Sequence, residues 1–360
     1  MKILFVFGGK QKGGAERVIT NLANNMIKKH DVYFLGLKKM NTFYEINDNI
    51  KYDFIEQAED YKSNFFIRNF NRTRRMYNSI KSVSPDIIIS FSREQSYRLL
   101  LTNFFNKRKI IISVRNDPKE EYKNFFEKCL MKILYLRVNG FVFQTKEARS
   151  FFPKSFQEKS VIIPNPINED YIDSFYEGER KNVIVTAGRL AEQKNHELLI
   201  DAFSKISGEF KDYKLIIYGS GSLENDLKEQ IKRLKLEKRV ILAGEVSCIK
   251  DKIINASLFV LSSRYEGMPN ALIEAMALGL PCISTDCPCG GPRYLIKNNI
   301  NGVLVPVGDE NKMAFEMKRL LNDKDLCLKL SKNATKVAKL LNPNKINKLW
   351  IDFIEEILGK

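Results

Sequence analysis

Residues 264–274 read RYEGMPNALIE and follow directly on an apolar run, LFVLSS, at residues 258–263. The apolar run predicts a buried strand, and the Ala- and Met-rich segment beyond the loop predicts a helix. Gly267, Pro269 and Asn270 are residue types that form tight turns and helix starts. We therefore expect a strand, a tight loop and a helix N-terminus in immediate succession.

This junction suits a ligand because backbone N–H groups and the positive end of the helix dipole meet there. Two carboxylates flank it: Glu266 lies in the loop, and Glu274 lies one turn into the helix. The N–H groups suit an anion, and the carboxylates can accept hydrogen bonds from hydroxyls. An anionic ligand that carries hydroxyl groups fits this pattern.

Both halves of the chain alternate strands with helices. In the second half, strands are expected at residues 182–188, 213–219, 239–244, 258–263, 281–285 and 302–307. In the first half, strands are expected at residues 2–7, 31–37, 50–55, 86–91, 109–114 and 141–143, with helices at residues 14–29, 64–83, 93–105 and 119–137. Nearly continuous apolar strands between amphipathic helices predict parallel sheets covered on both faces. The predicted fold class is α/β, with two Rossmann-like domains that face each other across a cleft.

The run VIIPNPIN at residues 161–168 interrupts the alternation, because two prolines flank an asparagine and polar residues follow. We place the domain boundary there, which gives an N-terminal domain at residues 1–168 and a C-terminal domain at residues 169–343. The last segment, residues 344–360, is expected to form a helix that packs back on the first domain. A chain of 360 residues is long enough for two such cores.

The net charge of +16 is concentrated in the first half of the chain. Residues 1–170 hold 30 Lys and Arg against 18 Asp and Glu, a net charge of +12. This excess predicts an anionic partner, which is a membrane surface, a nucleic acid or a phosphorylated substrate. A nucleic-acid-binding protein is disfavoured, because the sequence shows no helix-turn-helix, zinc-finger or RNA-binding signature.

Six scattered cysteines lack the density of a disulfide scaffold and fit a reducing compartment. Cys287-Pro288-Cys289 has no second Cys pair and no nearby His, so we expect no metal site. The N-terminal run MKILFVFGG loses its apolar character after a few residues, and no later run is long enough to span a membrane. We expect a cytoplasmic protein.

Ligands of open α/β sheets bind beyond the carboxyl ends of the strands. GRLAEQKNH follows the first strand of the second domain, and its Gly188 allows a ligand to approach closely. Arg189 and Lys194 place two cations at this strand end, and a bridging diphosphate would offset their repulsion. In the first domain, the Gly13-Gly14 pair opens a helix after the first strand. It is either a flexible turn or a point of close approach to a phosphate or sugar, and the sequence leaves both open.

Four motifs in chain order resemble the family-4 retaining glycosyltransferases, which have the GT-B fold. They are GGAERV at 13–18, GRLAEQKN at 188–195, YGSG at 218–221 and EGMPNALIEAMALGLPCIST at 266–285. The likeness covers nearly the whole chain, and the last motif is the most diagnostic. It implies transfer of a hexose or N-acetylhexosamine from a UDP-sugar to a saccharide acceptor on a polyprenyl diphosphate, in capsule, O-antigen or glycan biosynthesis.

The resemblance also implies roles for single residues. Arg189 and Lys194 would bind the donor diphosphate and stabilise the leaving group, while Glu266 would face the hydroxyls of the donor sugar; these three are the implied catalytic residues. Glu274 would hold the ribose hydroxyls. The other implied donor-binding residues are Gly14, Gly188, Gly219, Val246, Gly267, Met268, Asn270 and Ala271. Fixed cations replace a divalent ion in this family, so neither a metal nor another cofactor is expected.

The chain departs from the family pattern in one place. Many members carry a His just after the strand that matches residues 109–114, whereas this chain reads SVRNDP at residues 113–118. Arg115, Asn116 and Asp117 occupy the region instead. The departure leaves the identity of the donor sugar open, and we regard Asn116 as a candidate for acceptor binding.

The segment at residues 64–83 supplies a hypothesis about the acceptor. Phe66, Phe70, Tyr77 and Ile80 follow helical spacing, and Arg68, Arg72 and Arg75 line another face. A cationic helix with aromatic neighbours is typical of a membrane-surface contact or of a site that grips a lipid diphosphate. The alternative is a solvated helix face over an ordinary core. If the first interpretation holds, the protein lies on the inner face of the cytoplasmic membrane.

A sugar-nucleotide epimerase would share the two-domain architecture. Such an enzyme would need acid and base residues at a carbon of the sugar, and it would act without an acceptor. Transfer requires the acceptor, so an assay of UDP-sugars with and without a lipid-linked acceptor separates the two activities.

Overall fold

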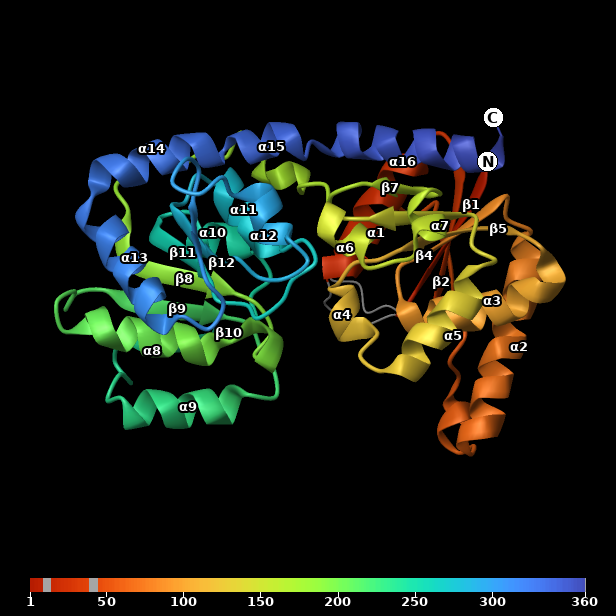
Figure 1. Cartoon of the computed structure of the whole chain (residues 1–360), viewed down its shortest axis with the longest axis horizontal. Helices are drawn as coiled ribbons and strands as arrows, with labels where there is room; N and C mark the ends of the chain where they lie inside the picture. Colours follow the sequence, from red (N-terminus) through yellow and green to blue (C-terminus); the bar gives the residue numbers. More distant parts are fainter. Residues whose placement is uncertain (9–13, 39–44, 360) are drawn as a thin grey trace. The chain divides into compact units, whose positions relative to one another are not determined.

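The structure is a computed structural model and describes residues 1–8, 14–38 and 45–359. The chain forms two compact units. The first unit comprises Met1–Pro166 and Pro343–Lys360, and the second comprises Ile167–Asn342. The C-terminal helix α16 therefore belongs to the first unit although it follows the second in sequence (Figure 1).

The first unit contains a parallel sheet of seven strands in the order β3-β2-β1-β4-β5-β6-β7. Its strands are β1 (Lys2–Phe7), β2 (Asp31–Gly36), β3 (Lys51–Phe54), β4 (Ile87–Ser90), β5 (Lys109–Ser113), β6 (Gly140–Phe143) and β7 (Ser160–Ile162). The central strands β1, β4 and β5 are apolar along most of their length, because both faces of a parallel sheet are covered.

Helices connect these strands. They are α1 (Gly14–Met26), η1 (Ala58–Tyr61), α2 (Phe65–Val83), α3 (Arg93–Asn106), α4 (Pro118–Glu121), α5 (Phe125–Tyr135), α6 (Lys146–Ser150), α7 (Lys154–Gln157) and α16 (Pro343–Leu358). Helix α16 buries Ile346, Trp350, Phe353 and Ile354 at helical spacing. These side chains share a core with residues of β1 and α1, which fixes the end of the chain to the first sheet.

The second unit contains a parallel sheet of six strands in the order β10-β9-β8-β11-β12-β13. Its strands are β8 (Lys181–Ala187), β9 (Lys214–Tyr218), β10 (Val240–Gly244), β11 (Ala256–Leu261), β12 (Cys282–Thr285) and β13 (Val303–Val305). Its helices are η2 (Glu169–Tyr171), η3 (Glu192–Lys194), α8 (His196–Ser207), α9 (Glu224–Arg233), α10 (Ile249–Ile253), α11 (Asn270–Ala277), α12 (Gly291–Leu295), α13 (Glu310–Asn322), α14 (Lys324–Ala334) and α15 (Lys336–Leu340).

Strand β11 shows why the strands of this sheet appear in the sequence as continuous apolar runs. Leu258 and Val260 lie in one core with residues of α8 and α13. Phe259 and Leu261 lie in a second core with residues of α11. Successive side chains of a strand point to opposite faces, so a sheet covered by helices on both sides needs apolar residues at every position.

The structure differs from the sequence prediction at two places in the first unit. Residues 160–162 form the edge strand β7, although residues 161–168 were expected to be a linker. The helix expected at residues 119–137 is divided into α4 and α5, because Asp117 caps the first and Asn124 caps the second. Among the residues that the structure describes, no helix is both long enough and apolar enough to cross a bilayer.

Candidate active site

The loop after β8 carries the two cations that the sequence singled out. Gly188 follows the strand, and Arg189 lies exposed in the next position. The single-turn helix η3 then ends at Lys194, and Asn195 adopts a left-handed conformation with φ of 49°. Asparagine tolerates this conformation better than most residues, which lets the chain reverse into α8.

The loop after β11 carries Glu266, whose side chain is buried. The Ser263 hydroxyl donates a hydrogen bond of 2.7 Å to Glu266 Oε1. Thr285, at the end of β12, donates through Oγ1 to the Ser263 carbonyl oxygen at 2.6 Å. These two hydroxyls hold the carboxylate in place, and the sequence analysis did not identify either of them. The sequence feature that could have identified them is a small hydroxyl residue at the end of each buried strand.

Lys194 and Glu266 meet in an ion pair between Lys194 Nζ and Glu266 Oε1. Strands β8 and β11 are neighbours in the sheet and run in parallel, so their carboxyl ends lie at the same edge. Only 16% of the Lys194 side chain and 7% of the Glu266 side chain are exposed, which shields the pair from most of the solvent. A cation and a carboxylate predicted from separate motifs therefore form one site.

Gln193 fastens the two loops together. Its side-chain Nε2 donates to the Tyr265 carbonyl oxygen at 3.0 Å. Its backbone carbonyl oxygen accepts a hydrogen bond from the Arg264 N–H at 2.8 Å. The Ser262 hydroxyl donates to the Lys194 carbonyl oxygen at 2.9 Å. These hydrogen bonds to backbone oxygens restrict the loops, and we conclude that Lys194 is held in position before any ligand binds.

Two glycines allow neighbouring loops to approach closely. A Cβ atom on Gly219 would lie 2.0 Å from the carbonyl oxygen of Gly188, and Gly219 has a φ of +141°. A Cβ atom on Gly291 would lie 1.7 Å from the carbonyl oxygen of Gly267. Both distances are too short for a side chain, so the site loops at Gly188 and Gly267 require glycine opposite them.

The remaining residues predicted to bind the donor lie at the start of α11 and near β10. Pro269 is the N-cap of α11, Asn270 is its first residue and Ala271 its second, so Asn270 is not the cap. Met268 and Glu274 are buried, and Met268 packs in the core beneath α11. Val246 follows β10 and is half-buried.

His196 supports this site although the sequence analysis assigned it no role. It is buried, and burial together with nearby Lys194 lowers its pKa to about 4. The ring is therefore neutral at physiological pH, and Nε2 lies 3.2 Å from the Arg189 carbonyl oxygen, to which it donates. This hydrogen bond restrains the backbone at Arg189.

Known proteins resemble the chain at this site and beyond it. Residues 168–337 match the family described as Glycosyl transferases group 1. An uncharacterized glycosyltransferase of Methanocaldococcus jannaschii is 30% identical to the chain over 79% of the chain and 82% of that protein. The chain belongs to the group 1 glycosyltransferases.

Other relatives cover the whole glycosyltransferase chain. A Campylobacter jejuni protein named GalNAc-alpha-(1->4)-GalNAc-alpha-(1->3)-diNAcBac-PP-undecaprenol alpha-1,4-N-acetyl-D-galactosaminyltransferase is 26% identical over 99% of both chains. The structure of HepE from Anabaena in complex with UDP matches with a TM-score of 0.83 at 17% identity, over 99% of this chain and 100% of that one. This likeness confirms the predicted GT-B fold class.

In the first unit of the glycosyltransferase, Arg115 lies in the interior beyond the end of β5. Its guanidinium is 4.5 Å from the ring centre of Phe91 and 5.5 Å from that of Trp350. Nη1 donates to Asn165 Oδ1 at 2.8 Å, and burial lowers the pKa of Arg115 to about 9. Arg115 therefore fastens α16 to the sheet, and Asn116 lies half-buried beside it.

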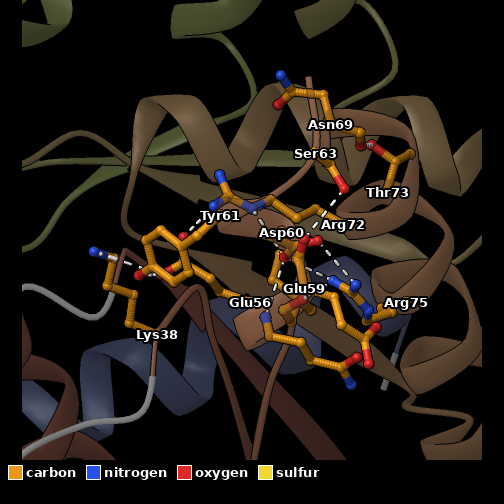
Figure 2. Close-up of polar contacts among 12 residues, drawn as sticks. Lys38, Glu56, Glu59, Asp60, Tyr61, Ser63, Asn69, Arg72, Thr73 and Arg75 are labelled. Carbon is orange, nitrogen blue, oxygen red and sulfur yellow. Dashed lines mark hydrogen bonds and ion pairs between the residues drawn. The ribbon is translucent and has the colours of Figure 1, made fainter. Parts of the chain in front are cut away.

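Two of the three arginines expected to form a cationic face on α2 are bound to carboxylates instead (Figure 2). Arg75 donates to Asp60 through Nη1 at 2.8 Å and through Nη2 at 2.9 Å. Arg72 pairs with Glu56 and lies 3.4 Å from Asp60. Asp60 is fully buried, and Arg75 lowers its pKa to about 2. The expectation of a free cationic face is wrong for Arg72 and Arg75, because Asp60 of η1 and Glu56, two residues before that helix, pack against them.

The aromatic stripe expected on α2 is also divided. Phe66 and Phe70 are exposed, whereas Ile80 is buried and Tyr77 is half-buried. Arg68 is half-buried, and its guanidinium lies 6.0 Å from the ring centre of Phe65. Only the N-terminal half of α2 therefore presents aromatic side chains to solvent.

The glycine-rich loop of the first unit lies mostly outside the described residues, which resume at Gly14, the first residue of α1. The two alternatives given for Gly13-Gly14, a flexible turn or a point of close approach to a phosphate or sugar, concern this segment.

A pocket of about 510 Å³ lies beside η3 and α8 in the second unit. It is lined by Ala191, Glu192, Asn195, His196, Glu197, Leu223, Asp226, Leu227 and Arg264. Three carboxylates against one arginine give it a negative lining, which repels a diphosphate. The edge of the sheet at Lys194 and Arg189 is the better place for an anionic donor.

Proposed function

We propose that this glycosyltransferase is a retaining enzyme of family 4 that transfers a hexose or N-acetylhexosamine from a UDP-sugar to a saccharide carried on a polyprenyl diphosphate. The observation that carries the proposal is the ion pair between half-buried Lys194 and buried Glu266 at the carboxyl edge of the second sheet. Arg189 lies five residues before Lys194 on the same loop. Together they supply two cations for a diphosphate and one carboxylate for sugar hydroxyls.

In the proposed reaction, the bond between the sugar C1 and the β-phosphate oxygen of UDP breaks, and a bond from C1 to the acceptor oxygen forms on the same face. The acceptor hydroxyl loses its proton to the leaving phosphate, so UDP departs with that proton. Arg189 and Lys194 stabilise the negative charge that develops on the phosphate. Glu266 orients the sugar, and Glu274 holds the ribose hydroxyls. In this reaction only one carboxylate, that of Glu266, faces the donor sugar. Most glycosidases instead use a pair of carboxylates at the reacting carbon.

We further propose that the reaction needs no divalent metal, since the fixed cations offset the charge of the diphosphate. Lys194 is held by the Ser262 contact and by Glu266, so its charge is preorganised. Activity should be the same in EDTA as in buffer with Mg²⁺. A loss of transfer in EDTA that added Mg²⁺ restores would overturn this part of the proposal.

The acceptor class is supported by the names of relatives. Besides the relative described above, a second Campylobacter jejuni enzyme, 28% identical over 96% of both chains, is named for a diphospho-undecaprenol substrate. We propose an acceptor of this class for the present chain and a location on the inner face of the cytoplasmic membrane, where such lipids are used. Asn116 is the candidate acceptor-binding residue in the first unit.

A donor and acceptor screen tests the proposal. UDP-GlcNAc, UDP-GalNAc, UDP-Glc, UDP-Gal and GDP-mannose are each incubated with the enzyme, with and without a polyprenyl-diphosphate-linked saccharide. We expect product only with a UDP-sugar and only when the acceptor is present, with the new linkage having the anomeric configuration of the donor. Turnover of a UDP-sugar without acceptor to give an isomeric UDP-sugar would show an epimerase, and a preference for GDP-mannose would overturn the proposal of a UDP-sugar donor.

A further inference from the structure

Helices α3 and α5 of the first unit expose large apolar side chains that the proposed reaction does not use. They are Leu101 and Phe104 on α3, and Phe125, Phe126, Ile133 and Leu136 on or directly after α5, which we call the α3–α5 surface. Phe125 is 82% exposed and Phe126 is 73% exposed. Proteins rarely leave adjacent phenylalanines this open unless another apolar phase covers them.

The two helices that carry these side chains lie side by side and run in the same direction. At their N-terminal ends, Arg93 of α3 contacts Glu127 of α5 at 3.3 Å. At their C-terminal ends, the guanidinium of Arg137 lies 4.4 Å from the ring centre of Phe104. Figure 1 shows the two helices as neighbours, with α2 next to α3.

Helix α5 carries apolar side chains both on its buried side and on its exposed side. Phe126, Ile133 and Leu136 are spaced by seven and three residues, so they form one stripe. Met131 and Tyr135, on the opposite side, are buried in the protein. The helix therefore has two apolar sides, and the protein covers only one of them.

The exposed N-terminal half of α2 continues this character. Phe65, Phe66, Ile67 and Phe70 are each at least half exposed. Arg98 of α3 donates to Asn69 Oδ1 of α2 at 3.0 Å, which joins this half of α2 to α3.

The charge around these helices is strongly positive. Residues 56–137, which include Arg72 and Arg75 together with their partners Glu56 and Asp60, hold 17 Lys and Arg against 9 Asp and Glu, a net charge of +8. Lys128 and Lys132 are exposed on α5, and Lys107 is exposed just after α3. Apolar side chains bordered by lysines are the pattern of a helix that lies in the interface of a membrane with anionic lipids.

We propose that the α3–α5 surface is a docking surface for an anionic lipid bilayer, with the phenylalanines inserted at the level of the headgroups. A second copy of the chain is the less suitable occupant, because it would bring the same positive charge to the contact. The surface does not involve Arg72 and Arg75, whose charges are used within the protein. The inference that the membrane presents the acceptor rests on the proposed function. Binding of the protein to the bilayer does not depend on that function.

Vesicle flotation tests the proposal without donor or acceptor. The wild-type chain and variants are mixed with vesicles of phosphatidylglycerol or of phosphatidylcholine, and the bound fraction is measured. The Phe125→Ser/Phe126→Ser variant should bind phosphatidylglycerol vesicles roughly 100-fold more weakly, since each inserted phenylalanine contributes about tenfold or more. The matched control is Phe315→Ser, because Phe315 is a 57% exposed phenylalanine on α13 of the second unit. It should bind as the wild type does.

Charge reversal on α5 gives a second, independent test. Lys128→Glu/Lys132→Glu should weaken binding to phosphatidylglycerol by about tenfold or more, with little effect on the weak binding to phosphatidylcholine. The control is Lys228→Glu/Lys232→Glu, a pair with the same spacing on α9. Circular dichroism checks that each variant is folded. UDP binding by calorimetry is measured separately, and a folded wild-type protein that floats but does not bind UDP would overturn the proposed function and leave the docking surface standing.

Three results would overturn the docking surface. One is unchanged flotation of the Phe125→Ser/Phe126→Ser variant. Another is an equal loss in the Phe315→Ser control. The third is a wild-type oligomer, measured by light scattering, that the Phe125→Ser/Phe126→Ser change converts to monomer without affecting flotation, which would assign the surface to a second copy.

Discussion

Half-buried Lys194 and buried Glu266 form an ion pair across the carboxyl ends of β8 and β11, although they are 72 residues apart in the sequence. The pair is held from both sides, by Ser262 at the Lys194 backbone and by Ser263 at the Glu266 carboxylate. Because neither partner is free to move, a ligand that binds here meets a fixed cation and a fixed carboxylate.

Removing the cation should chiefly slow the transfer. Lys194→Ala takes away charge that would stabilise the leaving phosphate, so kcat should fall by about 100-fold or more. It also leaves Glu266 buried without its cation, so the free energy of unfolding should fall on the order of 2 kcal/mol. Steady-state kinetics and urea titration measure the two effects. The control is Lys228→Ala, which removes an exposed lysine of α9 and should change neither.

The two carboxylates of the site should be separable by kinetics. Glu266→Gln removes the charge that orients the sugar, so it should lower kcat with little effect on UDP affinity. Glu274→Gln should weaken UDP binding by about 10- to 100-fold, because hydrogen bonds from ribose hydroxyls to a carboxylate are strong. Calorimetry with UDP and turnover with the UDP-sugar distinguish the two variants. The reverse result would mean that the two roles are exchanged.

A methyl group at Gly219 should disrupt the loop that carries Arg189. The new Cβ would lie 2.0 Å from the Gly188 carbonyl oxygen, and φ of +141° disfavours any side chain. Gly219→Ala should therefore lower the free energy of unfolding by about 2–3 kcal/mol and weaken UDP binding. Gly208→Ala is the control, because Gly208 has a φ of −66° and no atom within 4 Å of the new Cβ. If Gly219→Ala is as stable as this control, the close approach is not a constraint.

The buried Asp60 should stabilise the first unit. Asp60→Asn leaves Arg75 without its bidentate partner, and since Arg75 is partly exposed we expect a loss of about 2–3 kcal/mol in the free energy of unfolding. Glu59→Gln, an exposed position on the same turn, is the control and should have no measurable effect. Chemical denaturation of the three proteins provides the comparison.

The same aspartate gives an expected pH dependence. Its pKa in the folded protein is about 2, below the ordinary value of 3.8, so its stabilising contribution is present above pH 4 and is lost as the pH falls from about 4 toward 2. The difference in unfolding free energy between the wild type and Asp60→Asn should therefore shrink over that range. A difference that stays constant down to pH 2.5 would show that Asp60 does not titrate in this way.

The sequence by itself determined the local structure of both units. Apolar runs of three to seven residues located twelve of the strands to within one or two residues, because a strand buried on both faces needs apolar side chains throughout. Turn residues located the loops after β8 and β11, and the motifs on those loops named Arg189, Lys194 and Glu266. These features depend on neighbouring residues in the chain, which a sequence shows directly.

Only the tertiary structure decided which of these segments meet. That Lys194 contacts Glu266 follows from the pairing of β8 with β11, and strand order depends on packing between distant segments. That Arg72 and Arg75 are not free follows from the packing of η1 against α2, which brings Asp60 to them. The edge strand β7 is short and carries prolines just beyond it, so only its hydrogen bonds to β6 distinguish it from a linker. A sequence lists the charges of a protein, but the folded chain decides which of them neutralise one another and which remain available to a ligand.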